Sequence, residues 1–147
     1  MIQFKNVTKN FGSINALNDV SFEVKNGEFV FLTGPSGAGK TTILKMILHE
    51  ILADSGEVLF DNTNLAQIAN KDVPKLRQQI GIVFQDFKVL SERTVAENVE
   101  VALAVSEVNP DEWEARVKHV LKLVGLSNRS RLFPSQLSGG ELQRVSL

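Results

Sequence analysis

The segment that decides the fold reads Gly34-Pro35-Ser36-Gly37-Ala38-Gly39-Lys40-Thr41. It has the spacing G-x-x-x-x-G-K-T, in which the glycines let the backbone curl so that successive N–H groups point at phosphate oxygens. The lysine can reach β- and γ-phosphates, and the threonine hydroxyl can take a Mg²⁺ position. The segment therefore predicts a site for a nucleotide triphosphate, ATP together with Mg²⁺.

The sequence on either side of this loop supplies the context that such a site requires. Before the loop, Glu28–Thr33 contains the unbroken apolar run Phe29-Val30-Phe31-Leu32, which predicts a strand buried on both faces. After it, six apolar residues follow the spacing of one helical face: Ile43, Leu44, Ile47, Leu48, Ile51 and Leu52. A strand, the loop and a helix in this order predict an α/β fold with the anion at the positive end of the helix.

The loop also defines the first set of predicted site residues. Lys40 is predicted to stabilise the transferred phosphate and Thr41 to bind the metal. Kinases, GTPases, helicases and transporters all carry such loops, so the class of protein depends on other segments. The residues predicted to bind the nucleotide here are Gly34, Ser36, Gly37, Ala38, Gly39, Lys40, Thr41 and Thr42.

The periodicity of apolar residues, the turn residues and the helix caps predict further strands and helices. Short strands are predicted at Ile2–Val7, Val20–Lys25, Glu57–Phe60 and Ile80–Phe84. Helices are predicted at Asp72–Gln79, from the capping box at Thr94 through about Ala104, and from Asn109 to Val124, where Gly125 is a good terminator.

Composition excludes several classes of site. The 147 residues carry 16 basic and 17 acidic side chains, so there is no basic excess to indicate nucleic acid as a partner. The chain contains no cysteine, which excludes disulfides and zinc-thiolate sites. No stretch approaches the ~20 apolar residues that cross a bilayer.

A second motif near the end of the sequence narrows the class. Leu137-Ser138-Gly139-Gly140-Glu141 places Ser138 as the cap of a helix that begins at Gly139, with Glu141 completing a capping box. Two glycines without side chains let a ligand approach the positive end of that helix. Together with the phosphate loop, this motif resembles the signature of ABC-type ATP-binding subunits.

The resemblance implies a fold, an assembly and further site residues. The fold would be the P-loop NTPase core of the ABC ATPase type, with an N-terminal antiparallel β part and a helical subdomain. Two domains would pair head to tail as a homodimer, so that Ser138, Gly139 and Gly140 of one chain contact ATP bound by the other. Gln85 matches the glutamine that joins the Mg²⁺ and water network, giving it a catalytic and a metal-binding role. Phe11 matches the aromatic residue that stacks on adenine, although tyrosine is commoner there.

A narrower resemblance runs through the whole chain. Phe29–Lys40, Val83–Leu90 and Arg93–Val99 are similar to the FtsE family of bacterial cell-division ATP-binding proteins; Leu142 departs from that family, where glutamine is usual. The resemblance implies an integral membrane partner of the FtsX type and a cytoplasmic location, peripheral on the inner face of the plasma membrane. ATPases of lipoprotein-release or macrolide-efflux transporters share most of these motifs and stay as alternatives, as does an ATP-dependent clamp or scaffold with little hydrolysis.

The family pattern continues beyond the signature helix with an apolar strand that ends in Asp-Glu. We therefore expect a single ABC-type domain over residues 1–147 whose C-terminal part is missing, with a core over about 1–85 and a helical subdomain with the signature over about 86–140. Without that strand, the apolar run Phe29–Leu32 should be exposed. The parent protein is expected to hydrolyse ATP, whereas this piece should bind it weakly and turn over negligibly.

Overall fold

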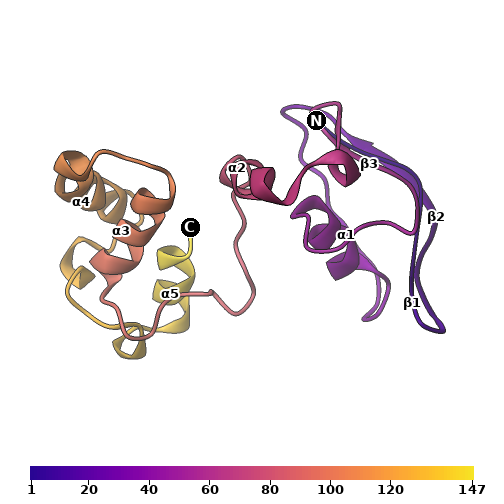
Figure 1. The fold of residues 1–147 in the computed structure, drawn as a ribbon. Coiled ribbons are helices and arrows are strands. Elements are labelled where there is room, and N and C mark those ends of the chain that lie inside the picture. Colours follow the sequence, from indigo (N-terminus) through magenta and orange to yellow (C-terminus); the bar gives the residue numbers. More distant parts are fainter. The chain divides into compact units, whose positions relative to one another are not determined.

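The computed structural model describes all 147 residues, which separate into two compact units, Met1–Ile80 and Gly81–Leu147 (Figure 1). The first unit contains every strand together with α1 (Lys40–Ile47) and α2 (Val73–Gln78). The second is helical, with α3 (Val95–Val105), α4 (Trp113–Leu123) and α5 (Gly139–Val145). No helix in either unit is long and apolar enough to cross a membrane.

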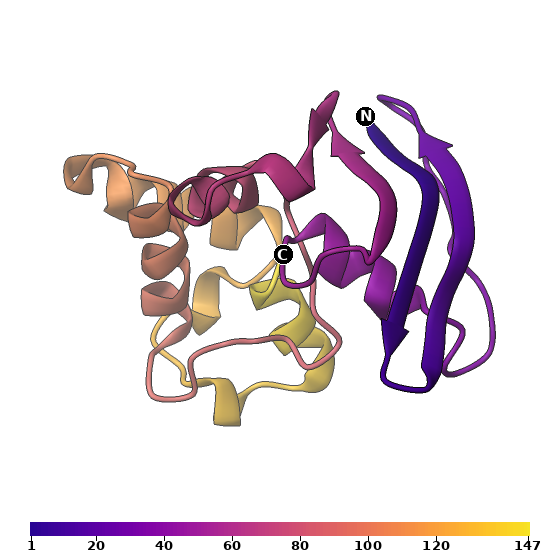
Figure 2. The ribbon, with the colours of Figure 1, turned by 45° about the vertical axis from the view of Figure 1, so that its right-hand side comes forward.

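The N-terminal unit is built on a four-stranded antiparallel sheet in the order β2-β1-β3-β4. β1 (Ile2–Phe11) and β2 (Ile14–Val24) form a long hairpin, visible in Figure 2, while β3 (Ser55–Phe60) and β4 (Thr63–Asn64) complete the sheet. Both hairpin strands are longer than predicted because Gly12, in the left-handed region at φ 58°, closes the turn between them. In β2, half-buried Val20, Phe22 and Val24 alternate with exposed neighbours, as predicted.

One apolar cluster joins this sheet to α1. Phe4 and Val7 of β1 and Leu17 of β2 are almost fully buried, and Ile43 and Met46 cover them from α1. The rings of Phe4 and Phe22 stack with their centroids 4.6 Å apart. Because α1 begins immediately after the glycine-rich loop, this cluster anchors the helix and thereby the loop to the sheet.

The end of α1 corrects the predicted helical face. The helix ends at Ile47, and His49 lies in the left-handed region at φ 53°, so Ile51 and Leu52 fall outside it. The N–H of Glu50 donates to the carbonyl of Lys45 across this end, which closes the last turn. The apolar spacing continues past the end of the helix because Ile51, in the following loop, also packs against the core. The predicted helix with Pro74 in its first turn is confirmed as α2.

The apolar run before the phosphate loop is not a strand. Residues Phe29, Val30, Phe31 and Leu32 are 81%, 49%, 78% and 46% exposed. No other segment of the chain pairs with this run, so it lacks the backbone hydrogen bonds that define a strand. The expected exposure is confirmed, and the expected strand is wrong. Gly81–Phe84 differs from prediction in the same way, with Val83 46% exposed.

The C-terminal unit packs around buried Val95, Val117, Leu121 and Leu126. The predicted capping box opens α3, where the Thr94 hydroxyl accepts from the Glu97 amide and the Glu97 carboxylate accepts from the Thr94 amide. A 3-10 turn at Pro110–Glu112 leads into α4, and Gly125 follows that helix at φ 70°. Local signals of capping and termination thus placed both ends of α3 and the end of α4 within one or two residues, whereas α4 itself begins four residues after the predicted start at Asn109.

Candidate nucleotide site

Glycine conformation shapes the loop that opens α1. Gly37 and Gly39 both lie at φ 83°, in the left-handed region that side chains disfavour. At Gly39, a Cβ atom would lie 2.4 Å from the carbonyl oxygen of Ala16 and 2.7 Å from Leu17 Cδ2. The loop therefore rests directly on β2 at Gly39, and only glycine fits this contact.

The first turn of α1 leaves its amides available for an anion. Gly39 is the N-cap and supplies no side chain, and no acidic residue lies in the first turn. The first return bond comes from the Ile43 amide to the Gly39 carbonyl at 3.0 Å, so the amides before Ile43 have no acceptor within the helix. By contrast, α3 and α5 are closed by complete capping boxes. The positive end of α1 is the one that faces the phosphate loop.

The ammonium group of Lys40 lies across the same loop. Its Nζ donates to the carbonyl oxygens of Gly34 and Pro35, each at 2.7 Å. The amide of Ala38 also donates to the Pro35 carbonyl, at 3.2 Å, which closes the curl of the backbone. A pocket of about 410 Å³ lies here, lined by Ser36, Gly37, Gly39, Lys40, Thr41 and Thr42. The structure thus brings most of the predicted loop residues to one cavity, while Gly34 and Ala38 shape its backbone.

Phe11 ends β1, in the same unit as the loop, and is not part of the apolar core. The residue is 46% exposed, and Lys9 Nζ lies 5.6 Å from the ring centroid. Lys9 is held there by an ion pair of 2.6 Å with Asp54. Phe11 does not line the loop pocket, so its predicted contact with adenine rests on its exposed ring face.

The signature segment forms the predicted capping box at the start of α5. The Ser138 hydroxyl accepts from the Glu141 amide at 3.3 Å, and the Glu141 carboxylate accepts from the Ser138 amide at 2.9 Å. A Cβ atom on Gly139 would meet nothing within 4 Å, and one on Gly140 only Arg144 Nη1 at 3.8 Å. The two glycines therefore present open backbone at the beginning of the helix.

Glu141 is held ionised by its partners. Arg129 Nε donates to Glu141 Oε1 at 2.9 Å, while the hydroxyl and amide of Ser138 donate to Oε2. These three donors, Arg129 foremost, lower the pKa of Glu141 from 4.5 to about 2. No spacing signal in the sequence connected Arg129 with Glu141, so sequence reasoning missed this residue.

This lowered pKa predicts how the C-terminal unit responds to acid. Because the pKa of Glu141 is lower in the folded chain than in the unfolded one, its stabilisation is complete above about pH 4.5 and is lost as the pH falls toward 2. Glu141→Gln should therefore flatten the loss of stability over that range, measured by urea unfolding at a series of pH values. Glu114→Gln, which removes an exposed carboxylate of α4 without a partner, should keep the original slope. Equal slopes in both variants would contradict the assignment.

Gln85 is an exposed residue in a turn that follows Gly81–Phe84. It and Ser138–Gly140 belong to the C-terminal unit, whereas the phosphate loop belongs to the N-terminal one. Their relation to the loop, and with it the metal role of Gln85 beside Thr41, stays a prediction.

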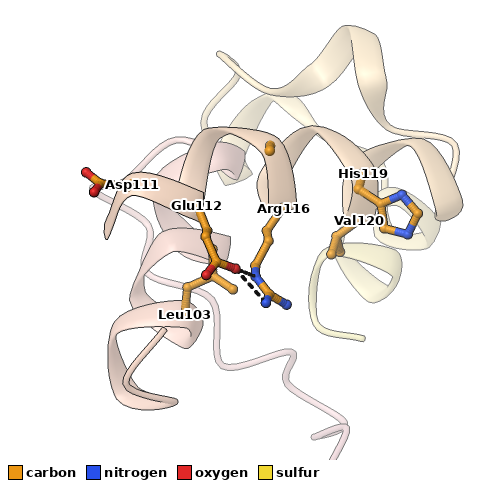
Figure 3. Close-up of a pocket in the computed structure, with 7 residues that line it drawn as sticks. Leu103, Asp111, Glu112, Arg116, His119 and Val120 are labelled. Atoms are coloured by element: carbon orange, nitrogen blue, oxygen red, sulfur yellow. Dashed lines mark hydrogen bonds and ion pairs between the residues drawn. The ribbon is translucent and has the colours of Figure 1, made fainter. Parts of the chain in front are cut away.

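A larger pocket in the C-terminal unit, of about 460 Å³, does not have the character of a catalytic site (Figure 3). Its lining includes the adjacent acidic residues Asp111 and Glu112 together with Arg116 and His119 of α4; Figure 3 shows Glu112 against Arg116, whereas Asp111 points away from both Arg116 and His119. Arg116 donates to Glu112 Oε2 from Nε at 2.9 Å and from Nη2 at 2.7 Å, so the carboxylate is already paired. Because this pair opens a helix and does not end a strand, it does not replace the Asp-Glu strand of the resemblance.

Comparison with known proteins identifies the family of the chain. The family described as "ABC transporter" matches residues 17–147. Over the whole chain, the sequence is 48% identical to the cell division ATP-binding protein FtsE of Bacillus subtilis and 43% identical to FtsE of Escherichia coli. The chain spans 65% of the length of the first of these relatives and 67% of the second.

Solved structures give the same family. The dimeric structure of MJ0796, a bacterial ABC transporter cassette, is similar with a TM-score of 0.88 and 37% identity, over 99% of this chain and 67% of that one. A dimeric post-hydrolysis state of the same cassette, bound to ADP and Pi, gives a TM-score of 0.87 over the same shares of the two chains. The chain has the ABC ATPase fold and belongs to the ABC transporter family, as an FtsE-like ATP-binding domain.

Proposed function

We propose that the chain binds ATP with Mg²⁺ through residues 34–42 and serves as the nucleotide-binding part of a complex that couples ATP to a membrane partner of the FtsX type. The observation that carries the proposal is the phosphate loop itself. Its backbone is docked on β2 at Gly39, Lys40 lies across it, and the uncapped start of α1 follows. This combination supports recognition of a polyphosphate by amides, a helix end and one ammonium group.

Each group at the loop has a defined task in this proposal. The amides before Ile43 bind phosphate oxygens, and the ammonium group of Lys40 turns from the loop carbonyls to the β- and γ-phosphates. The Thr41 hydroxyl and the side-chain carbonyl oxygen of Gln85 would hold Mg²⁺, which would neutralise charge on the phosphate oxygens. The exposed ring of Phe11 stacks on the adenine base.

The signature residues complete the site from a second chain. We propose a head-to-tail homodimer in which the open backbone of Ser138, Gly139 and Gly140 contacts the γ-phosphate bound by the loop of the other copy. The similarity to dimeric ABC cassette structures supports this arrangement. With 16 basic and 17 acidic side chains, the chain has no basic excess that would favour nucleic acid as a partner.

Hydrolysis belongs to the whole protein in this proposal. Phosphoryl transfer needs groups that position the attacking water and stabilise charge around Mg²⁺. The relatives are longer than this chain, and the adjacent acidic pair Asp111-Glu112 lies in the turn before α4, where Glu112 is bonded to Arg116. We therefore assign ATP binding to these 147 residues and ATP hydrolysis to a protein of the relatives' full length, acting at the inner face of the plasma membrane.

Recruitment to vesicles tests the choice of partner. Vesicles that contain an FtsX-type membrane protein are expected to bind the chain in a sedimentation assay, and Mg-ATP should increase the bound fraction. Empty vesicles and vesicles with a lipoprotein-release permease are the controls. Binding to the permease but not to the FtsX-type protein would contradict the proposed partner and favour the lipoprotein-release transporter as the complex that contains this chain.

A further inference from the structure

Asn98 of α3 holds the segment that leads into its own helix. Its Oδ1 accepts from the amide of Leu90 at 2.7 Å, and its Nδ2 donates to the carbonyl of Leu90 at 3.1 Å. The same Nδ2 reaches the carbonyls of Arg93 and Thr94 at 3.2 and 2.9 Å. One side chain therefore contacts four backbone groups of the segment 90–94, with the two N–H bonds of Nδ2 shared among three carbonyls. It fixes the position of Leu90, a residue that is 47% exposed.

The beginning of α3 is bonded to a second segment, more than 30 residues later in the chain. The amide of Val95 donates to the carbonyl of Leu132 at 2.8 Å, and the amide of Ala96 donates to that of Ser130 at 2.9 Å. The amide of Leu132 in turn donates to the Arg129 carbonyl at 2.9 Å, closing the turn. Val95 is fully buried, so the apolar core supports this junction from behind.

Arg129 continues the connection to the signature segment. Its guanidinium donates to Glu141, and the other oxygen of that carboxylate accepts from both the hydroxyl and the amide of Ser138. The Glu141 side chain is only 19% exposed, whereas that of Arg129 is 48% exposed. The orientation of the Ser138 hydroxyl is therefore set by Glu141, and the orientation of Glu141 by Arg129.

We propose that Asn98 and Arg129 are positioning residues in a hydrogen-bonded relay that joins the exposed Leu90 to Ser138. The relay consists of Leu90, Asn98, the start of α3, the turn 129–132, Glu141 and Ser138. The relay deepens the proposed function and rests on it for the role of Ser138 toward nucleotide. A protein partner that displaces Leu90 would change the orientation of the Ser138 hydroxyl. Contact along the relay does not by itself establish energetic coupling. Coupling means that a substitution at the Asn98 end changes a property measured at the Glu141 end.

The first measurement is amide hydrogen exchange of the chain without nucleotide. Asn98→Ala should accelerate exchange about fivefold at the amides of Leu132 and Glu141, because one end of the relay is released. Asn98→Asp keeps the acceptor for Leu90 and should give a smaller effect in a chain of the same shape. The matched control is Asn109→Ala, which removes a side-chain acceptor for the Asp111 amide in the same unit, outside the relay.

Two outcomes of this exchange experiment would overturn the relay. Unchanged exchange at Glu141 would show that Asn98 acts only on its own loop. Equal acceleration throughout α4 would show that Asn98 is merely structural, since α4 lies outside the relay. Neither outcome involves ATP, so failure of the relay is distinguishable from failure of the proposed function.

The second measurement follows the carboxyl group of Glu141 by ¹³C NMR titration. Arg129→Met should raise the pKa of Glu141 from about 2 toward 4.5, and Arg129→Lys should restore part of the lowering. Asn98→Ala should move the same pKa upward, although the structure records no hydrogen bond between Asn98 and Glu141. A pKa of Glu141 that ignores Asn98 would contradict the coupling.

Discussion

Replacing Gly39 with alanine is expected to lower the free energy of unfolding of the N-terminal unit by about 2–5 kcal/mol, since left-handed strain and overpacking add. The left-handed backbone at φ 83° disfavours any side chain. The new methyl group would also lie 2.4 Å from the Ala16 carbonyl oxygen, which is a backbone atom of β2 and not the end of a flexible side chain. Urea unfolding followed by circular dichroism measures the change.

Gly37→Ala is the matched control for this prediction. Gly37 lies in the same loop with the same φ of 83°, but a Cβ atom there would meet nothing within 4 Å. It should therefore lose only the conformational part, about 1–2 kcal/mol. If both variants lost equal stability, the loop would not be docked on β2 as the structure shows.

Removal of the ammonium group at Lys40 is expected to weaken Mg-ATP binding roughly 10–100-fold, which corresponds to hydrogen bonds of about 1.5–3 kcal/mol to charged groups. Lys40→Ala also removes the bonds to the Gly34 and Pro35 carbonyls that hold the loop curled. Fluorescence titration with a labelled ATP analogue measures the affinity. Lys45→Ala, which removes the basic residue from the last turn of the same helix, should bind as the original chain does. Equal losses in the two variants would indicate a general effect of charge.

Local chemistry explains the parts of the fold that could be predicted. The capping boxes at Thr94 and Ser138, Pro74 in the first turn of α2 and Gly125 after α4 act within one turn of their own residue. The helix ends that they define can therefore be predicted without knowledge of the rest of the chain. The glycine-rich loop is similar, since its spacing alone places the start of α1.

Strands could not be predicted as reliably because a strand needs a partner. Phe29–Leu32 and Gly81–Phe84 have the apolar composition of buried strands, yet no other segment pairs with either of them. Apolar composition reports a tendency to be buried, whereas backbone pairing depends on another segment. The extended hairpin of β1 and β2 failed in the opposite sense, because pairing lengthened strands beyond their apolar residues.

The candidate site likewise has parts that local sequence predicts and parts that depend on distant segments. Its loop and signature residues were predicted from spacing, but the contact of Gly39 with Ala16 and the ion pair of Arg129 with Glu141 join residues far apart in the sequence. Neither contact affects the spacing of residues near it in the sequence, so neither could be predicted from the sequence. Both determine the conformation of a predicted motif, which is why substitutions at these positions carry large expected effects.

Calorimetric titration of the 147-residue chain with nucleotides in the presence of Mg²⁺ tests the central claim most directly. We expect saturable binding of ATP and ADP and no saturable binding of AMP, because the loop amides and Lys40 recognise the β- and γ-phosphates. Binding of AMP as tight as that of ATP, or no binding of ATP at all, would contradict the assignment of Gly34–Thr42 as the site of the triphosphate.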